Sequence, residues 1–162
     1  MTITVTDYVS VADRIAELGC NVPSGIAILP DNFPKAATRQ DLLFGSEAST
    51  IRKLFKNNNF PIDDLLPVGE RVGAIHNKHF EWAPLLFISV GLLSNDPNAV
   101  TVALGIIANY ATDFFKGMSG KNVKLNVVVE KKKDHTCKMI SYEGDISGLS
   151  TLSNVIRRIS DE

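Results

Sequence analysis

The chain has 162 residues, of which 44% are hydrophobic and 22% are charged, and its formal net charge is −1. This length is close to that of one ordinary domain, and the composition is that of a globular protein, which excludes wholesale disorder. Residues 1–115 hold 8 Lys and Arg against 12 Asp and Glu, whereas residues 116–162 hold 9 against 6. The C-terminal part can therefore attract an acidic partner, but the asymmetry is too weak to establish nucleic-acid binding.

Cysteine usage and the first residues indicate the compartment. The only cysteines are Cys20 and Cys137, which make neither a disulfide framework nor a zinc pattern. The first segment, MTITVTDYVSVADRIAELG, lacks a basic region followed by an apolar core, so it does not read as an export signal. We expect a reduced, cytoplasmic protein.

The first thirty residues predict a helix and then a buried strand. Apolar side chains recur at helical spacing over Tyr8–Leu18, with Thr6 or Asp7 as the N-cap and Gly19 as the stop signal. The short apolar run Gly25–Leu29 is bounded by prolines, which is typical of a buried strand.

The next fifty residues predict a further helix and two short strands. The helix spans Glu47–Lys56, and Ser46 can cap it. The strand candidates are Ile62–Leu66 and Arg71–Ile75, separated by a turn that contains Pro67. The N-terminal half is therefore expected to be a small mixed α/β part.

From residue 82 onwards the pattern becomes strongly apolar. The run Trp82–Leu93 and the stretch Ala99–Lys116 predict two apolar helices in a hairpin, with Pro97 opening the second. Two alternating runs within Val123–Gly144 then flank a charged turn and predict a β-hairpin. A helical stripe of apolar residues closes the chain: Leu149, Leu152, Val155, Ile156 and Ile159.

The helix predicted over residues 99–116 carries most of the functional interpretation. Its polar residues fall on one narrow stripe: Thr101, Gly105, Asn109, Thr112, Asp113 and Lys116. The rest of its surface is apolar and must be covered, either by the core of the chain or by a second protein. Neither apolar run reaches the roughly 20 residues that a membrane span needs. Tyr110, Phe114 and Phe115 are the candidate interaction residues on this helix.

The densest group of possible metal ligands or acid–base residues is His76, His79 and Glu81. Two histidines at i and i+3 share a face on a helix but lie on opposite faces of a strand. A zinc site would need a further ligand, so we favour exposed loop residues and expect no cofactor. The alternative is a small metal-dependent hydrolase centred on these three residues.

A second alternative rests on the basic residues of the C-terminal part. Lys131, Lys132 and Lys133 form the turn of the predicted hairpin, and three further cations, Lys138, Arg157 and Arg158, extend the possible basic surface. Such a surface could bind phosphate backbones. Lysine-rich turns also keep exposed sheet edges from aggregating, so we prefer solvation to nucleic-acid binding.

The stretches VALGIIANYATDFFKG and VKLNVVVEKKKDHTCKMISYEGDISGL carry a resemblance to known proteins. Within residues 82–162 the chain resembles uncharacterised bacterial cytosolic proteins, whose helix–hairpin–helix layout is similar to accessory modules that accompany effectors in bacterial conflict and signalling systems. The resemblance implies an accessory role and no assigned activity.

Together these patterns predict one compact α+β domain over residues 1–162. A mixed α/β part, residues 1–80, is expected to pack on an apolar helical hairpin, β-hairpin and terminal helix in residues 81–162. Whether the chain is an enzyme is left open, and a non-catalytic role is favoured. The expected function is protein interaction or assembly, by formation of a homo-oligomer or by docking on a partner protein through apolar surface near helix 99–116.

Overall fold

The computed structural model describes residues 1–70, 73–74, 84–116 and 122–162. The fold is α+β and is built on a five-stranded mixed sheet of order β1-β7-β6-β5-β2. Neighbouring strands run antiparallel except for β5 and β6, which run parallel. In sheet order the strands are β1 (Thr2–Tyr8), β7 (Cys137–Asp145), β6 (Asn122–Glu130), β5 (Leu85–Ile88) and β2 (Ile26–Ile28). The sheet thus combines strands from both halves of the chain.

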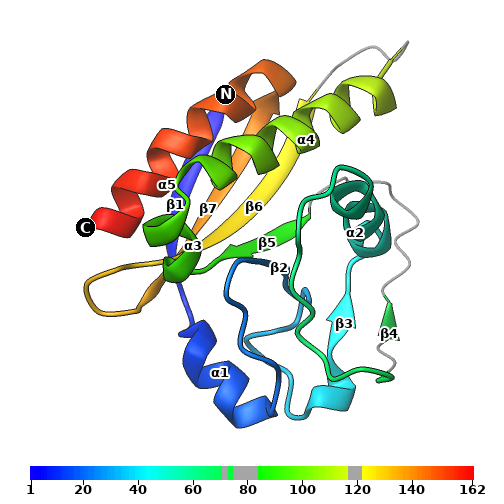
Figure 1. Ribbon diagram of the computed structural model, residues 1–162, viewed down its shortest axis with the longest axis vertical. Coiled ribbons are helices and arrows are strands. Elements are labelled where there is room, and N and C mark those ends of the chain that lie inside the picture. Colours follow the sequence, from blue (N-terminus) through cyan, green and yellow to red (C-terminus); the bar gives the residue numbers. More distant parts are fainter. Residues whose placement is uncertain (71–72, 75–83, 117–121) are drawn as a thin grey trace.

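The helices cover the two faces of this sheet unequally. Figure 1 shows α4 (Asn98–Phe114) and α5 (Leu152–Asp161) side by side across one face, with the 3-10 segment η2 (Ile146–Thr151) leading into α5. Helix α2 (Ala48–Asn57) packs on the same side, next to β2 and β5. Helix α1 (Val11–Leu18) packs on the opposite face. The short helix α3 (Val90–Asn95) links β5 to α4.

Strand alternation sorts the buried side chains into two cores. On β6, Val127 and Val129 enter the core beneath α4 and α5, whereas Val128 enters the core beside α1. The second core contains the apolar face of α1 and the loop residues Phe33 and Leu42. It contacts β2, β5 and only the adjoining ends of β6 and β7. The sheet is therefore covered on both faces at its β2 end and mainly on one face at its β1 end.

The N-terminal segment corrects one sequence prediction. Helix α1 begins at Val11 rather than Tyr8, and its N-cap is Ser10, whose hydroxyl accepts the Asp13 N–H at 3.2 Å. The preceding residues form β1, because threonine alternates there with Ile3 and Val5, and β-branched side chains favour strands. The predicted stop is confirmed: Gly19 adopts a left-handed φ of 71°.

The segments from residue 43 to residue 75 match the predictions in part. Helix α2 lies within one residue of the predicted helix, but its N-cap is Glu47, and no side chain caps it. In the first strand candidate, Asp63 alone forms a bridge, to Ala27 of β2. In the second, the described residues Gly73–Ala74 form β4, which pairs in parallel with β3 (Leu43–Phe44). A short 3-10 turn, η1 (Arg39–Asp41), precedes β3.

The predicted helix over Trp82–Leu93 is wrong over the strand β5 and is confirmed only at Val90–Leu93, which lie in α3. Leu85–Ile88 forms β5, whose four residues are buried on both faces between β6 and β2. A short run that is apolar on every side fits a doubly covered strand as well as a buried helix, so periodicity cannot separate the two. The expected helical hairpin is therefore a strand, the short helix α3 and α4.

The remaining C-terminal elements are confirmed. Helix α4 exposes its predicted polar stripe and buries Ala99, Val100, Ala103, Leu104, Ile107 and Ala111. Strands β6 and β7 form the predicted hairpin, and η2 with α5 forms the terminal helical segment. No helix in the described part of the chain is both long and apolar enough to cross a membrane.

Candidate functional site

The possible metal ligands His76, His79 and Glu81 lie outside the described residues. Across residues 1–70, 84–116 and 122–162, no three His, Cys, Asp or Glu side chains come together in a way that could hold a metal ion. The metal-dependent alternative thus gains no supporting observation from the described part of the chain.

The structure gathers the three aromatic interaction candidates at the C-terminal end of α4. The rings of Tyr110 and Phe114 stack with centroids 6.1 Å apart, and Phe114 meets Phe115 edge-on at 4.9 Å. All three side chains are half-buried, and Tyr110 and Phe115 pack against the main core. Much of their apolar area is therefore already used within the chain.

The basic residues do not form an uncompensated surface. Lys131 lies 3.8 Å from Glu162, Lys132 lies 2.9 Å from Asp161, and Lys138 is paired with Asp7 of β1. A further member of the set, Arg157, donates to the carbonyl of Pro97 at 3.3 Å, while Lys133 and Arg158 are exposed. Phosphates would have to compete with these carboxylates, which weakens the argument for nucleic-acid binding.

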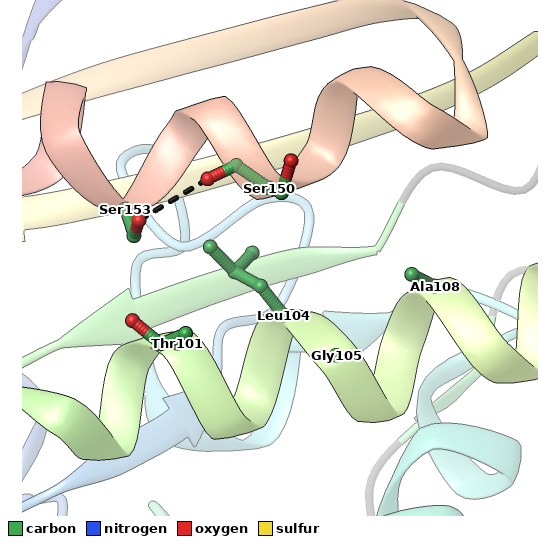
Figure 2. Close-up of a pocket in the computed structure, with 6 residues that line it drawn as sticks. All are labelled: Thr101, Leu104, Gly105, Ala108, Ser150 and Ser153. Atoms are coloured by element: carbon green, nitrogen blue, oxygen red, sulfur yellow. Dashed lines mark hydrogen bonds between the residues drawn. The ribbon is translucent and has the colours of Figure 1, made fainter.

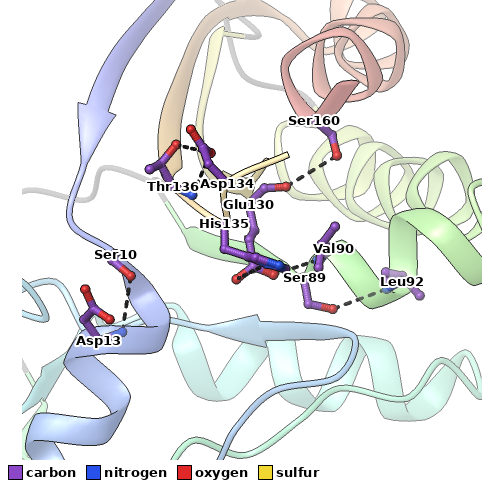
Figure 3. Close-up of polar contacts among 10 residues, drawn as sticks. All are labelled: Ser10, Asp13, Ser89, Val90, Leu92, Glu130, Asp134, His135, Thr136 and Ser160. Atoms are coloured by element: carbon purple, nitrogen blue, oxygen red, sulfur yellow. Dashed lines mark hydrogen bonds and ion pairs between the residues drawn. The ribbon is translucent and has the colours of Figure 1, made fainter. Parts of the chain in front are cut away.

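The polar residues around the hairpin turn anchor α3 (Figure 3). Glu130, only 8% exposed, accepts the Val90 N–H at 3.0 Å, and its carbonyl accepts the Ser160 hydroxyl at 3.4 Å. His135 Nδ1 lies 3.9 Å from the other Glu130 carboxylate oxygen. Ser89 caps α3 by accepting the Leu92 N–H at 3.3 Å. This cluster satisfies orphan N–H groups at the helix start and has a structural role.

Burial of the β7 cysteine, Cys137, disfavours its reactive thiolate form. Burial raises the pKa of the Cys137 thiol to about 11, so it remains protonated at neutral pH. Burial also raises the pKa of the Cys20 thiol. Because the thiolate is the nucleophilic form, neither side chain resembles an activated nucleophile.

A hollow of about 170 Å³ lies between α4 and the η2–α5 segment. Figure 2 shows the residues that line it. Its lining consists of small or aliphatic residues: Thr101, Leu104, Gly105, Ala108, Ser150 and Ser153. The Ser153 hydroxyl donates to the Ser150 carbonyl at 3.1 Å, so it is already bonded within its own helix. The hollow reflects two helices that meet through small residues, and it presents no converging reactive groups.

A larger depression lies between the end of α2 and the α3–α4 corner. It consists of an apolar hollow of about 400 Å³ and a more polar one of about 330 Å³, which share Phe60 and Pro61. We call their combined lining the docking groove: Arg52, Lys56, Phe60, Pro61, Ile62, Asp64, Leu92, Asp96, Asn98, Ala99 and Val102. It includes part of the helix that the sequence marked as an interaction element.

The end of α2 builds one wall of the docking groove. Asn59 adopts a left-handed φ of 56°, and the Phe60 N–H donates to the Phe55 carbonyl at 2.9 Å, which closes the helix with a reversal of the chain. The Phe60 ring then packs on the buried Phe55 ring, with centroids 5.2 Å apart. The partly buried Phe60 side chain therefore packs against the core and also lines the groove.

The α3–α4 corner builds the opposite wall. The Asp96 N–H donates to the Leu92 carbonyl at 2.8 Å and ends α3, after which α4 begins at Asn98. Ala99 and Val102 lie three residues apart and so share one face of α4. Val102 is 53% exposed and is the only large apolar side chain of α4 that is exposed rather than half-buried or buried. An apolar side chain is thus presented to solvent beside Leu92.

Charge is distributed unevenly along the docking groove. At the α2 end, Arg52 is paired with Asp64 and lies 5.4 Å from the centre of the Phe44 ring. Lys56 is exposed and has no carboxylate partner among the described residues. Asp96 lies at the apolar end. The α2 end therefore offers a cation next to apolar surface.

Sequence reasoning did not identify this groove, because its walls come from segments far apart in the chain. Phe60 follows a helix end, and Leu92 lies in a run predicted as one long helix. The available indication was Val102, an apolar residue that directly follows Thr101, the first residue of the polar stripe.

Comparison of the chain with protein-family models, with curated proteins and with solved structures finds no match in any of the three.

Proposed function

We propose that the chain is a non-catalytic protein-interaction module that binds a segment of a partner protein in the docking groove. The observation that carries the proposal is the 53% exposed Val102, which lines a hollow with Phe60 and Leu92. The other apolar side chains of its helix are buried or half-buried. Exposed apolar surface that is concentrated in a depression is typical of protein-binding sites.

Chemistry at the two ends of the groove specifies the occupant. The apolar end suits aliphatic or aromatic side chains, because Leu92, Ala99 and Val102 offer them no hydrogen-bonding side chain. The other end suits a carboxylate, because the Lys56 ammonium group is exposed there. The proposed occupant is therefore a short amphipathic segment that carries an acidic side chain at one end.

The wider role belongs to the same proposal. From the sequence of residues 82–162 we expect an accessory module of a bacterial system, and a docking site for a partner segment is what such a module would use.

A peptide selection followed by matched variants tests this function. Random displayed peptides are selected on the purified protein, and the Kd of an enriched peptide is measured by fluorescence anisotropy. Val102→Glu should raise the Kd about tenfold or more, because it places a charge in the apolar end. Val22→Glu makes the same change at a valine that is 81% exposed outside the groove, and it should leave the Kd unchanged.

Two outcomes would contradict the proposal. One is a failure to enrich any peptide with apolar and acidic positions. The other is equal binding of the enriched peptide by wild type and by Val102→Glu. Lys56→Gln provides a finer test, because it should weaken acidic peptides and leave their amide analogues unaffected.

A further inference from the structure

The first strand of the chain forms one edge of the sheet. All seven residues of β1 pair in continuous antiparallel register with β7, from Thr2 opposite Glu143 to Tyr8 opposite Cys137. Within the described residues, β7 is its only strand partner. Alternate N–H and C=O groups of β1 therefore point away from the sheet, as they do on any edge strand.

This edge lacks the features that normally prevent two edges from pairing. It contains no proline or glycine, and its continuous register shows no bulge. Its one charged residue, Asp7, is already engaged by Lys138 of the neighbouring strand. An edge of this length, rich in threonine and other β-branched residues, is well suited to accept another strand.

The two faces of β1 differ in chemistry. Ile3 and Val5 lie on the side of α4 and α5, because they pair with Tyr142 and Ile140, which belong to the core there. Ile3 packs against that core, while Val5 is 41% exposed. The opposite face carries three exposed threonines, Thr2, Thr4 and Thr6. A pairing strand must therefore offer an apolar face and a hydroxyl face in the same alternation.

We propose that a second copy of this chain supplies that strand, with the two β1 strands antiparallel about a two-fold axis at Thr4. In this register Ile3 of each copy lies opposite Val5 of the other, and Thr2 lies opposite Thr6. Apolar and threonine pairs of this kind stabilise antiparallel strands. The two five-stranded sheets then form one continuous sheet, and the exposed area of Val5 becomes covered.

The position of Asp7 distinguishes this register from the one with its axis at Val5. An axis at Val5 would pair all seven residues of β1, but it would place the Asp7 carboxylate opposite Ile3. The Thr4 axis pairs Thr2–Thr6 without a charged residue and places Asp7 opposite Met1, outside these five residues, where its carboxylate stays paired with Lys138. The pairing uses a surface separate from the docking groove, so the two proposals can fail independently.

Sedimentation equilibrium on purified full-length variants tests the pairing. Thr4→Lys places two lysines directly opposite each other at the axis, and it should raise the dimer Kd about tenfold relative to wild type. Thr2→Lys adds the same charge on the same face but opposite an uncharged threonine, so it should change the Kd far less. The double variant Thr2→Lys with Thr6→Glu should dimerise at least as well as wild type, because it creates two cross-strand ion pairs.

Circular dichroism melting of each variant confirms that the monomer still folds, which is expected because these threonines are exposed. A wild type that remains monomeric up to millimolar concentration would overturn the proposal. So would a dimer that Thr4→Lys and Thr2→Lys weaken equally, or one that only Val102→Glu disrupts.

Discussion

The two edges of the main sheet differ in length and in how they are finished. Strand β2 has three residues, all buried, and the Asp63 N–H donates to the Ile26 carbonyl on its outer side at 2.8 Å. Strand β1 has seven residues, five of them exposed, and no other described strand pairs beyond it. One edge is closed by the chain itself, and the other offers its backbone to a further strand.

The difference shows how one edge of a small sheet can be blocked by the chain while the other edge stays open for a further strand. At the β2 edge, the Asp63 carboxylate also accepts hydrogen bonds from the N–H groups of Ser24 and Gly25, at 3.0 and 2.7 Å. These bonds hold in place the residues that directly precede β2. At the β1 edge, threonine hydroxyls keep one face polar without blocking the backbone. The proposed association therefore uses only the β1 edge.

The largest expected effect concerns the helical cover of the β1 end. A Cβ added at Gly148 would lie 2.0 Å from the Tyr142 hydroxyl oxygen, and this tyrosine is buried on β7. Gly148→Ala should therefore lower the free energy of unfolding by about 3 kcal/mol, measured by urea denaturation. Gly105→Ala on α4 is the matched control, because nothing lies within 4 Å of its added Cβ. It should stabilise the protein by about 1 kcal/mol through helix propensity. Equal effects of the two changes would contradict the close packing of Gly148 in η2 against Tyr142.

The next largest effect concerns the Asp63 carboxylate at the closed β2 edge. Asp63→Ala leaves the Ser24 and Gly25 N–H groups without their acceptor and should cost about 2 kcal/mol of unfolding free energy. Asp64→Ala removes the neighbouring carboxylate, which makes only a surface ion pair with Arg52, and should cost under about 1 kcal/mol. If the two alanine variants melt alike, the Asp63 carboxylate does not hold Ser24 and Gly25 in place at the β2 edge.

The smallest effect concerns the charge on the open edge. Lys138 lowers the pKa of Asp7 through a hydrogen bond and its positive charge. A carboxyl whose folded pKa is depressed stabilises the protein above its unfolded pKa of 3.8, and this contribution is lost as the pH falls through the lower folded value. Asp7→Asn should therefore lower the Tm slightly at neutral pH. The difference from wild type should vanish in acid, and a constant difference at all pH values would contradict the pairing.

Much of the fold could be predicted where the hydrophobic pattern has one clear period. Helices α4 and α5 each have one buried face, and the β6–β7 hairpin alternates over most of its length. The predicted ranges of these elements agree with the structure to within a few residues. The pattern failed at β5, which is apolar on both faces, and at the start of the chain, where strand and helix signals adjoin. In both places the sheet decides the conformation through distant partners.

The candidate sites were less predictable than the fold. The lysines of the hairpin turn form a cluster in sequence, but their partners Asp161 and Glu162 come from the last residues of the chain. The docking groove brings together Phe60 and Val102, which are 42 positions apart in the sequence. Local patterns carry no information about such pairings, so the sequence could indicate an interaction helix without indicating its exposed part.

Hydrogen exchange of the β1 and β2 amides, measured over a range of protein concentrations, tests the central claim about the two edges most directly. We predict that protection of the β1 amides rises with concentration, because a second strand covers their outward N–H groups, while protection of the β2 amides stays constant. If β1 exchanges at the same rate at every concentration, the open edge does not pair with a second copy.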